Sequence, residues 1–330
     1  MWLALTRAPA RRIHGAGVGP VGPIAAGVDR PMVRDEIDMV IAAAMVGIDE
    51  ECEPPGSQPP TGRDAIRSLH DLGSREVLDA SLAACRDADP LRRRVGAAVL
   101  GQLGHAEVGF TPVFVAERFR GLADLLAAEI AGPNDPDVLS EVCIALGHLG
   151  DPGAVPLLLR VLDHPDADIR FGVAFALGGQ ETPEAVDGLI ALSRDADDDV
   201  RDWATFGLGG LTTADGPALR AALQARLDDG NHIIRFEAIE GLAVRGDRSV
   251  IPALIRALEQ DVSLPLLDAA AALATPDLCD ALAAAAAGGL VIEASYGPYD
   301  LTKVWREAMH RCGCDEAAAQ PPPDTPDQEG

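Results

Sequence analysis

The densest group of side chains able to bind a metal lies near the C-terminus of the chain. The run from His310 to Cys314 offers one imidazole and two thiols, and Cys279 is a candidate fourth ligand for zinc. Structural zinc sites usually carry two separated pairs of ligands, whereas Cys-x-Cys is also common where a helix simply ends. We therefore expect a helix that ends at Gly313, with no bound metal and no cofactor.

The other histidines do not form a catalytic arrangement. His105, His148 and His164 each fall in an expected turn, and no nucleophile and carboxylate accompany them in the pattern of a triad. The sequence contains neither a Walker phosphate-binding loop nor a dinucleotide fingerprint. We predict no catalytic residue, and the residues favour a non-enzymatic protein without deciding the point.

The charge of the chain limits its partners. There are 52 acidic and 27 basic residues, which gives a formal net charge of −25. Phosphate backbones attract basic surfaces and repel acidic ones, so we expect no nucleic-acid partner. A protein or peptide partner is compatible with this charge.

The cysteines and the hydropathy suggest a compartment. The six cysteines are scattered without the spacing of a disulfide framework, so we expect reduced thiols and a cytoplasmic protein. The longest apolar run, from Ala281 to Ile292, is much shorter than the roughly 20 residues that span a bilayer. We expect no membrane-spanning helix and no membrane partner.

Any binding site must be positioned by an internal repeat. A phrase that runs from Asp-x-Arg to Ala-Leu-Gly or Gly-Leu-Gly occurs at Arg170 and Arg201, and recurs in looser form around Leu139 and Arg235. Apolar residues at −1, +3, +6 and +7 from the arginine form one stripe of a helix. Each unit predicts a helix A, a tight turn, a helix B and an acidic turn, with Asp as the N-cap. We expect the glycine after Ala-Leu to end helix A.

This pattern resembles HEAT repeats, and specifically the short bacterial HEAT-like repeats named after phycobilin lyases. The resemblance covers roughly Thr61 to Gly288. It implies an all-α fold, an α-α superhelix (α-solenoid) of about seven HEAT-like helical hairpins that stack because none buries its stripe alone. It also implies a structural ladder of aspartates and arginines, interrupted at Leu139, whose members are Asp168, Arg170, Asp199, Arg201 and Arg235.

The composition suggests five segments. Residues 1–31 read as a disordered or mis-assigned N-terminal extension, and residues 32–60 as an N-terminal helix with a Pro-rich linker. The repeats occupy residues 61–288. Residues 289–314, which include Trp305, read as a capping helix, and residues 315–330 as a disordered acidic and Pro-rich tail.

Enzymes built from HEAT-like repeats need particular residues, and the sequence can be searched for them. Deoxyhypusine hydroxylases hold iron with repeated His-Glu pairs, and no His-Glu dipeptide occurs in this sequence. HEAT-like DNA glycosylases use a basic concave face, which the acidic charge disfavours. Phycobilin lyases offer no short motif to compare, so a lyase function would rest on analogy of fold alone.

Three features offer sites for a partner. The first is a group of aromatic residues on successive A helices, which either pack between helices, the interpretation that we favour, or form an exposed anchor strip. The second is an insertion at residues 106–120 that carries Phe110 and Phe114. The third is a set of arginines on the B helices, which we expect on the concave side, where they suit an acidic peptide. The aromatic residues are Phe171, Phe175, Trp203, Phe206 and Phe236, and the arginines are Arg160, Arg220 and Arg256.

The leading hypothesis is a non-enzymatic scaffold or adaptor that binds a protein or peptide on the solenoid surface. One alternative is a phycobilin-lyase-like or other cofactor-handling enzyme on the same scaffold. Another is an immunity or regulatory protein that inhibits its partner. The sequence leaves the oligomeric state open.

Overall fold

The computed structural model describes residues 32, 34–46, 48, 62–106, 109–110, 113–294 and 297–314. The chain divides into two compact units, Met1–Ala176 and Leu177–Gly330. Paired helices build both units, and the fold is the all-α solenoid that the repeats predict. None of the described helices is long and apolar enough to cross a membrane.

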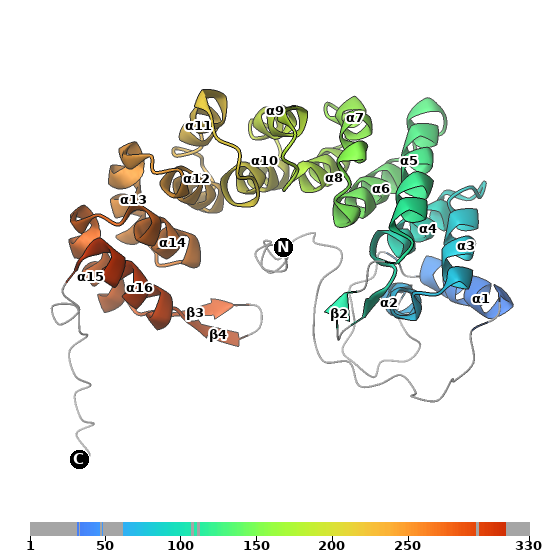
Figure 1. Cartoon of the computed structure of the whole chain (residues 1–330), viewed down its shortest axis with the longest axis horizontal. Helices are drawn as coiled ribbons and strands as arrows, with labels where there is room; N and C mark the ends of the chain where they lie inside the picture. The colour runs from blue at the N-terminus through green and yellow to red at the C-terminus, as the bar shows by residue number, and fades with distance from the viewer. Residues whose placement is uncertain are drawn as a thin grey trace, which may run out of the picture. The chain divides into compact units, whose positions relative to one another are not determined.

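The first unit begins with three helices and continues with helical hairpins (Figure 1). Its elements are α1 (Arg34–Met45), α2 (Gly62–Leu72), α3 (Arg75–Ala84), α4 (Pro90–Gln102), β1 (His105–Ala106), β2 (Gly109–Phe110), α5 (Val115–Ala131), α6 (Pro136–Leu149), η1 (Pro152–Ala154), α7 (Val155–Leu158), η2 (Leu159–Val161) and most of α8 (Ala167–Leu177).

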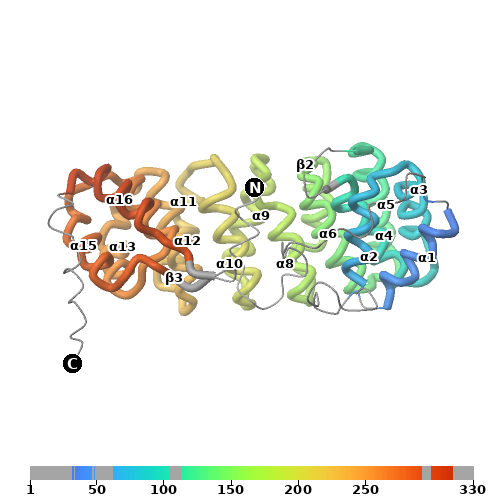
Figure 2. Tube along the Cα trace, turned by 90° about the horizontal axis from the view of Figure 1, so that it is seen from below, coloured from blue at the N-terminus to red at the C-terminus, as the bar shows by residue number. Residues whose placement is uncertain are grey.

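The second unit continues the pairing in chain order (Figure 2). Its elements are α9 (Pro183–Leu192), α10 (Asp198–Phe206), the π-helix η3 (Gly207–Leu211), α11 (Pro217–Gln224), α12 (His232–Val244), η4 (Arg248–Val250), α13 (Ile251–Leu258), α14 (Leu264–Leu273), η5 (Pro276–Leu278), α15 (Cys279–Ala287), β3 (Val291–Ala294), β4 (Gly297–Asp300) and α16 (Thr302–Cys312).

The helices begin where the sequence supplies caps. The Asp197 carboxylate accepts from the N–H groups of Asp199 and Val200 at the start of α10, and Asn231 does the same for Ile233 in α12. These side chains satisfy N–H groups that have no partner within the helix. The predicted capping of the A helices is confirmed at these positions.

The glycine of the Ala-Leu-Gly phrase ends helix A in α8, which ends directly before Gly178, but it does not do so in α4 or α6, so the expectation was wrong for these two repeats. Gly147 lies inside α6, which ends at Gly150 in the left-handed conformation, with φ of 65°. A Cβ on Gly147 would lie 2.6 Å from the Phe175 ring, and one on Gly241 would lie 2.6 Å from the Cα of Gly209. The glycine is needed for close packing of neighbouring A helices, and the helix end falls later. The second such glycine is Gly101, inside α4, whereas Gly241 of α12 lies two positions earlier in its repeat.

The repeat arginine holds the acidic turn that precedes its own helix. In each of four repeats, one guanidinium nitrogen donates to the carbonyl oxygens of the residues six and five positions earlier. A planar guanidinium with five N–H groups suits this because it reaches two carbonyls and still has donors to spare. The arginines are Arg93, Arg170, Arg201 and Arg235.

Two other arginines close the C-terminal ends of A helices. Arg118, which is fully buried, donates to the carbonyl oxygens of Leu100 at 2.6 Å and Gly101 at 2.7 Å. Arg245 does the same in the second unit, to Leu208 at 2.8 Å among others. Burial lowers the pKa of Arg118 to about 10. The last carbonyls of a helix lack partners within it, and these guanidinium groups supply them.

The B helices do not line the inner side of the bend, contrary to our expectation. In the second unit, Figure 1 shows α10, α12, α14 and α16 along the inner side and α9, α11, α13 and α15 along the outer side. The physical reason lies in the A helices. Gly209 in η3, which continues α10, and Gly241 in α12 allow these A helices to approach closely, which favours a bend toward the A helices.

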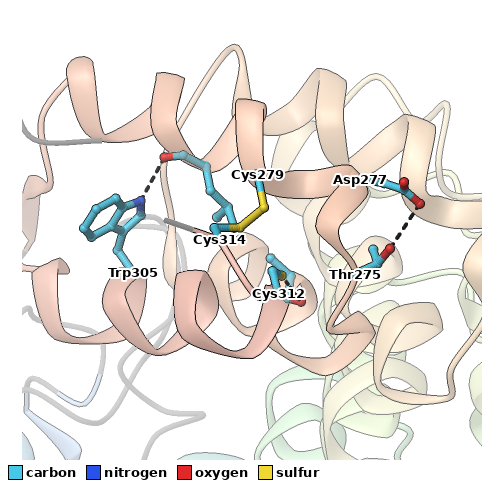
Figure 3. Close-up of a disulfide and its surroundings, with 8 residues drawn as sticks. Thr275, Asp277, Cys279, Trp305, Cys312 and Cys314 are labelled. Carbon is cyan, nitrogen blue, oxygen red and sulfur yellow. Dashed lines mark hydrogen bonds between the residues drawn. A yellow bond between two sulfur atoms is a disulfide. The ribbon is translucent and has the colours of Figure 1, made fainter. Parts of the chain in front are cut away.

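The expectation that all cysteines are reduced was wrong. Cys279 in α15 and Cys314 form a disulfide, with their Cα atoms 5.4 Å apart (Figure 3). The predicted helix end at Gly313 is confirmed, and it explains the pairing. Gly313 has a φ of 73°, which turns the chain back over α16 and brings Cys314 to α15. The Cys279 and Cys314 thiols are thus joined to each other. Cys85, Cys143 and Cys312 are free and buried.

The last helix covers the end of the second unit. Trp305 of α16 is 6% exposed, and its indole N–H donates to the carbonyl oxygen of Leu282 in α15 at 2.8 Å (Figure 3). An antiparallel hairpin, β3 with β4, precedes this helix. The sequence analysis did not predict the hairpin.

Candidate partner-binding face

One face of each A helix points away from its B helix. The positions one and five residues after the repeat arginine lie a turn apart on the helix, roughly opposite the buried stripe. We call these positions the A face. In the second unit the A face consists of Asp202 and Phe206 on α10, and of Phe236 and Glu240 on α12.

Aromatic rings on α10 are held by each other and by glycine. Trp203 is 6% exposed, whereas Phe206 is partly exposed. The two rings meet edge to face with centroids 5.8 Å apart. The Phe206 ring lies over exposed Gly210, where a Cβ would be 3.1 Å from the ring atom Cε2. The ring of Phe206 is thus fixed in place while part of its surface remains open.

On α12, the aromatic residue of the A face is buried. Phe236 is 7% exposed, and its ring meets that of exposed His232 edge to face at 5.6 Å. Phe236 therefore serves packing more than it offers surface.

In the first unit, Phe171 and Phe175 of α8 are both partly exposed. The Phe175 ring meets the His148 ring edge to face at 5.1 Å. The Nε2 atom of His148 lies 2.9 Å from the Nε2 atom of Gln102, so α4, α6 and α8 contribute to one row. His148, which we assigned to a turn, lies in the last turn of α6 and supports an aromatic ring.

Burial thus divides the five aromatic residues into two groups. Trp203 and Phe236 are core residues, as the packing interpretation requires. Phe171, Phe175 and Phe206 keep part of their surface open. Phe171 and Phe175 are open on the A face of the first unit, and Phe206 is open on that of the second unit.

The members of the expected ladder lie at the turns. Arg201 donates to the Asp229 carboxylate at 3.0 and 3.2 Å and to the Asp198 carboxylate at 2.7 Å. The backbone N–H of Asp199 donates to the Asp197 carboxylate, and that of Asp168 to the Asp166 carboxylate. Arg201 therefore links its own repeat to the turn of the next one.

The three B-helix arginines differ in how far their side chains are exposed and hydrogen-bonded. Arg160 and Arg256 are exposed. Arg220 donates to both carboxylate oxygens of Asp215 at 2.7 Å and to the carbonyl oxygen of Arg245 at 2.8 Å. These bonds tie Arg220 to its own loop, so it is less available to a partner than the other two.

The insertion contains the β1–β2 hairpin, in which Phe110 pairs with His105, and the side chain of Phe110 lies outside the described atoms. Phe114 precedes α5 in the left-handed conformation, with φ of 50°. The Arg75 guanidinium lies 5.7 Å from the centre of the Phe114 ring. Phe114 is thus covered on one side by its own unit.

The sequence analysis missed the most unusual residue of the A face. Asp202 is 8% exposed, and among the described atoms its Oδ1 has no hydrogen-bond partner. Burial, followed by the charges of Asp199, Asp198 and Asp229, raises the pKa of Asp202 to about 7. The alignment of the repeats could have indicated this residue, because Asp202 places an acid at the position where other repeats have Phe171 and Phe236.

Together the fold and this face define an α-solenoid scaffold. A profile of HEAT repeats matches residues 123–209 and 186–275. Residues 123–275 therefore contain HEAT repeats, as the sequence predicts. No curated protein matches the chain.

One solved structure supports the fold, and a second shares weaker similarity. The YibA protein of Escherichia coli is 19% identical, with a TM-score of 0.58, and the match covers 87% of this chain and 100% of that one. The CpcE–CpcF complex of phycocyanin lyase from Nostoc sp. PCC7120 is 21% identical over 72% of this chain and 81% of that one, with a TM-score of 0.38. At these identities the likeness to YibA shows the fold alone.

Proposed function

We propose that this protein is a non-enzymatic scaffold that binds a protein or peptide partner on the A face. The observation that carries the proposal is the partial exposure of Phe171, Phe175 and Phe206 in a chain whose aromatic content is only 4%. Aromatic side chains that are open to solvent are the usual anchors of protein interfaces.

The packing of these rings supports the same role. Phe175 is held by His148, and Phe206 by Trp203 and Gly210. A ring that is already fixed loses little conformational entropy when a partner covers it. The A face is therefore pre-organised for binding.

The experiment compares the phenylalanines of the A face with the exposed arginines of the B helices. Wild-type protein, the double variant Phe171→Ala/Phe206→Ala and the control Arg160→Ala/Arg256→Ala are used as tagged bait in lysate, and retained proteins are identified by mass spectrometry. Phe171 and Phe206 are chosen because they are only partly buried, so their loss leaves the core residue Trp203 in place. Circular dichroism establishes that each variant is folded.

We expect a partner that wild type and the arginine control retain and that the folded phenylalanine variant loses. Retention by the phenylalanine variant, or loss with the arginine control alone, would move the interface away from the A face. A wild-type protein that retains no specific partner would contradict the scaffold proposal.

A further inference from the structure

One side-chain oxygen of Asp202, Oδ1, has no hydrogen-bond partner in the described part of the chain. The side chain is buried on α10. Burial of a carboxylate without a partner costs several kcal/mol, and buried polar atoms are nearly always paired. An exception of this kind calls for an explanation.

The residues at the same position of other repeats, directly after the position of the repeat arginine, either have a partner or are apolar. Arg94 lies 3.7 Å from the Glu141 carboxylate, and the Ser140 hydroxyl donates to the carbonyl oxygen of Asp168 at 3.2 Å. Phe171 and Phe236 are apolar. The Nε atom of Arg94 also lacks a hydrogen bond, but Arg94 has an ion-pair partner in Glu141, whereas the Oδ1 atom of Asp202 has neither kind of partner among the described residues.

Arg201, the neighbour of Asp202 in the sequence, does not supply a partner. The Nε and NH2 atoms of Arg201 donate to the Asp229 and Asp198 carboxylates. Its NH1 atom donates to the carbonyl oxygens of Asp195 and Ala196. These five bonds use the whole donor capacity of a guanidinium. Arg201 is therefore fully engaged at the turn.

The surroundings favour an incoming cation. Asp198, Asp199 and Asp229 lie close enough to Asp202 to act on its charge. Glu240 adds a further acid to the A face, and the whole chain has a net charge of −25. Phe206 lies one helical turn from Asp202 on the same face of α10, so its partly exposed ring is available to an aliphatic stem or to a cation–π contact.

We propose that Asp202 receives an arginine or lysine side chain of the bound partner, whose neighbouring apolar residues cover Phe206. The inference rests on the proposed function, because it names the chemistry of the segment that the A face binds. A charge-assisted hydrogen bond from a guanidinium or ammonium group would satisfy the buried carboxylate, which gains most where water is excluded. The partner segment is therefore basic.

The probe is a phage-displayed library of random peptides, panned on the immobilised wild-type chain. Selected peptides are synthesised, together with analogues in which citrulline replaces arginine or norleucine replaces lysine. Their affinities are measured by fluorescence polarisation for wild type, Asp202→Asn, Asp202→Ser and Asp187→Asn. Ser is the residue at this position in α6, and Asp187 is an exposed acid on the B helix α9, so Asp187→Asn makes the same change of charge elsewhere.

We expect selected peptides to share an arginine or lysine, and Asp202→Asn and Asp202→Ser to weaken binding about tenfold or more. Asp187→Asn should stay within about twofold of wild type. The uncharged analogues should bind wild type about tenfold more weakly, with little further loss on Asp202→Asn, because both changes remove the same interaction.

Two other results separate this inference from the proposed function. Peptides that bind wild type and both folded Asp202 variants equally would overturn the role of Asp202 and leave the scaffold standing, provided that Phe206→Ala weakens them. A library from which wild type selects nothing would contradict peptide binding on the A face, and the inference with it.

Discussion

The guanidinium of Arg201 donates hydrogen bonds to both oxygens of the Asp229 carboxylate, at 3.0 and 3.2 Å. These bonds connect α10 to the turn before α12. The Arg201 and Asp229 side chains are 14% and 6% exposed. The pair connects two repeats rather than two residues of one helix. An interaction of this kind makes the stability of one repeat depend on its neighbour.

Arg201→Ala should therefore lower the free energy of unfolding by about 3 kcal/mol. The change removes both guanidinium bonds to the buried Asp229 carboxylate, which among the described residues keeps only the backbone N–H of Asn231 as a hydrogen-bond donor, and it removes the side-chain donor to two turn carbonyls. Urea unfolding followed by circular dichroism measures the change. Arg194→Ala, an exposed arginine nearby, is the control and should change stability by no more than about 0.5 kcal/mol. Equal effects of the two variants would show that the link between repeats is weak.

Asp202→Asn should change how stability depends on pH. Burial raises the pKa of Asp202 to about 7, with Asp199, Asp198 and Asp229 adding to the effect and Arg201 engaged elsewhere. The folded protein thus binds this proton more tightly than the unfolded chain does. The resulting stabilisation is complete at low pH and is lost as the pH rises from about 4 to about 7.

Relative to wild type, the Asp202→Asn variant should therefore gain stability across that range, by at most about 1.4 kcal/mol per pH unit. Urea unfolding of both proteins at several pH values measures the difference, and the other titrating groups cancel in the comparison. A difference that stays constant between pH of about 4 and about 8 would mean that Asp202 titrates normally.

Loss of the Cys279–Cys314 disulfide should loosen the C-terminal helix. The bond closes a loop with a sequence separation of 35, and removing such a cross-link typically costs about 2–4 kcal/mol. We expect Cys279→Ser/Cys314→Ser to be less stable and α16 to exchange its amide hydrogens faster. Reductant should destabilise wild type and leave the double variant unchanged. A reductant effect on both proteins would point to another cause.

Gly241→Ala should destabilise the second unit even though alanine favours helices. A Cβ at this position would lie 2.6 Å from the Cα of Gly209 and 2.9 Å from a methyl carbon of Leu223. Such overpacking costs about 1–3 kcal/mol, which outweighs a gain in helix propensity of about 1 kcal/mol.

Gly230→Ala is the matched control for this change, because a Cβ there meets nothing within 4 Å. It should leave the thermal unfolding midpoint nearly unchanged, while Gly241→Ala lowers it. A stabilised Gly241→Ala protein would contradict the close approach of α10 and α12.

The sequence by itself determined the repeat and the class of fold. Three local features predict the repeat, because each depends only on residues a few positions away in the chain. They are the apolar stripe, an N-cap such as Asp197 and a proline at the start of a B helix such as Pro183. The aromatic residues of the A helices could be found in the same way, because helical spacing places them on one face.

Only the tertiary structure decided which side chains have partners. Asp202 looks like any surface aspartate in the sequence, yet it is only 8% exposed in the structure. Cys314 meets Cys279 because Gly313 reverses the chain, and Arg118 finds the carbonyl groups of α4 from the next helix. Hydrogen bonds and burial act over a few ångströms between segments far apart in the chain, so the pattern of residues along it does not encode them locally.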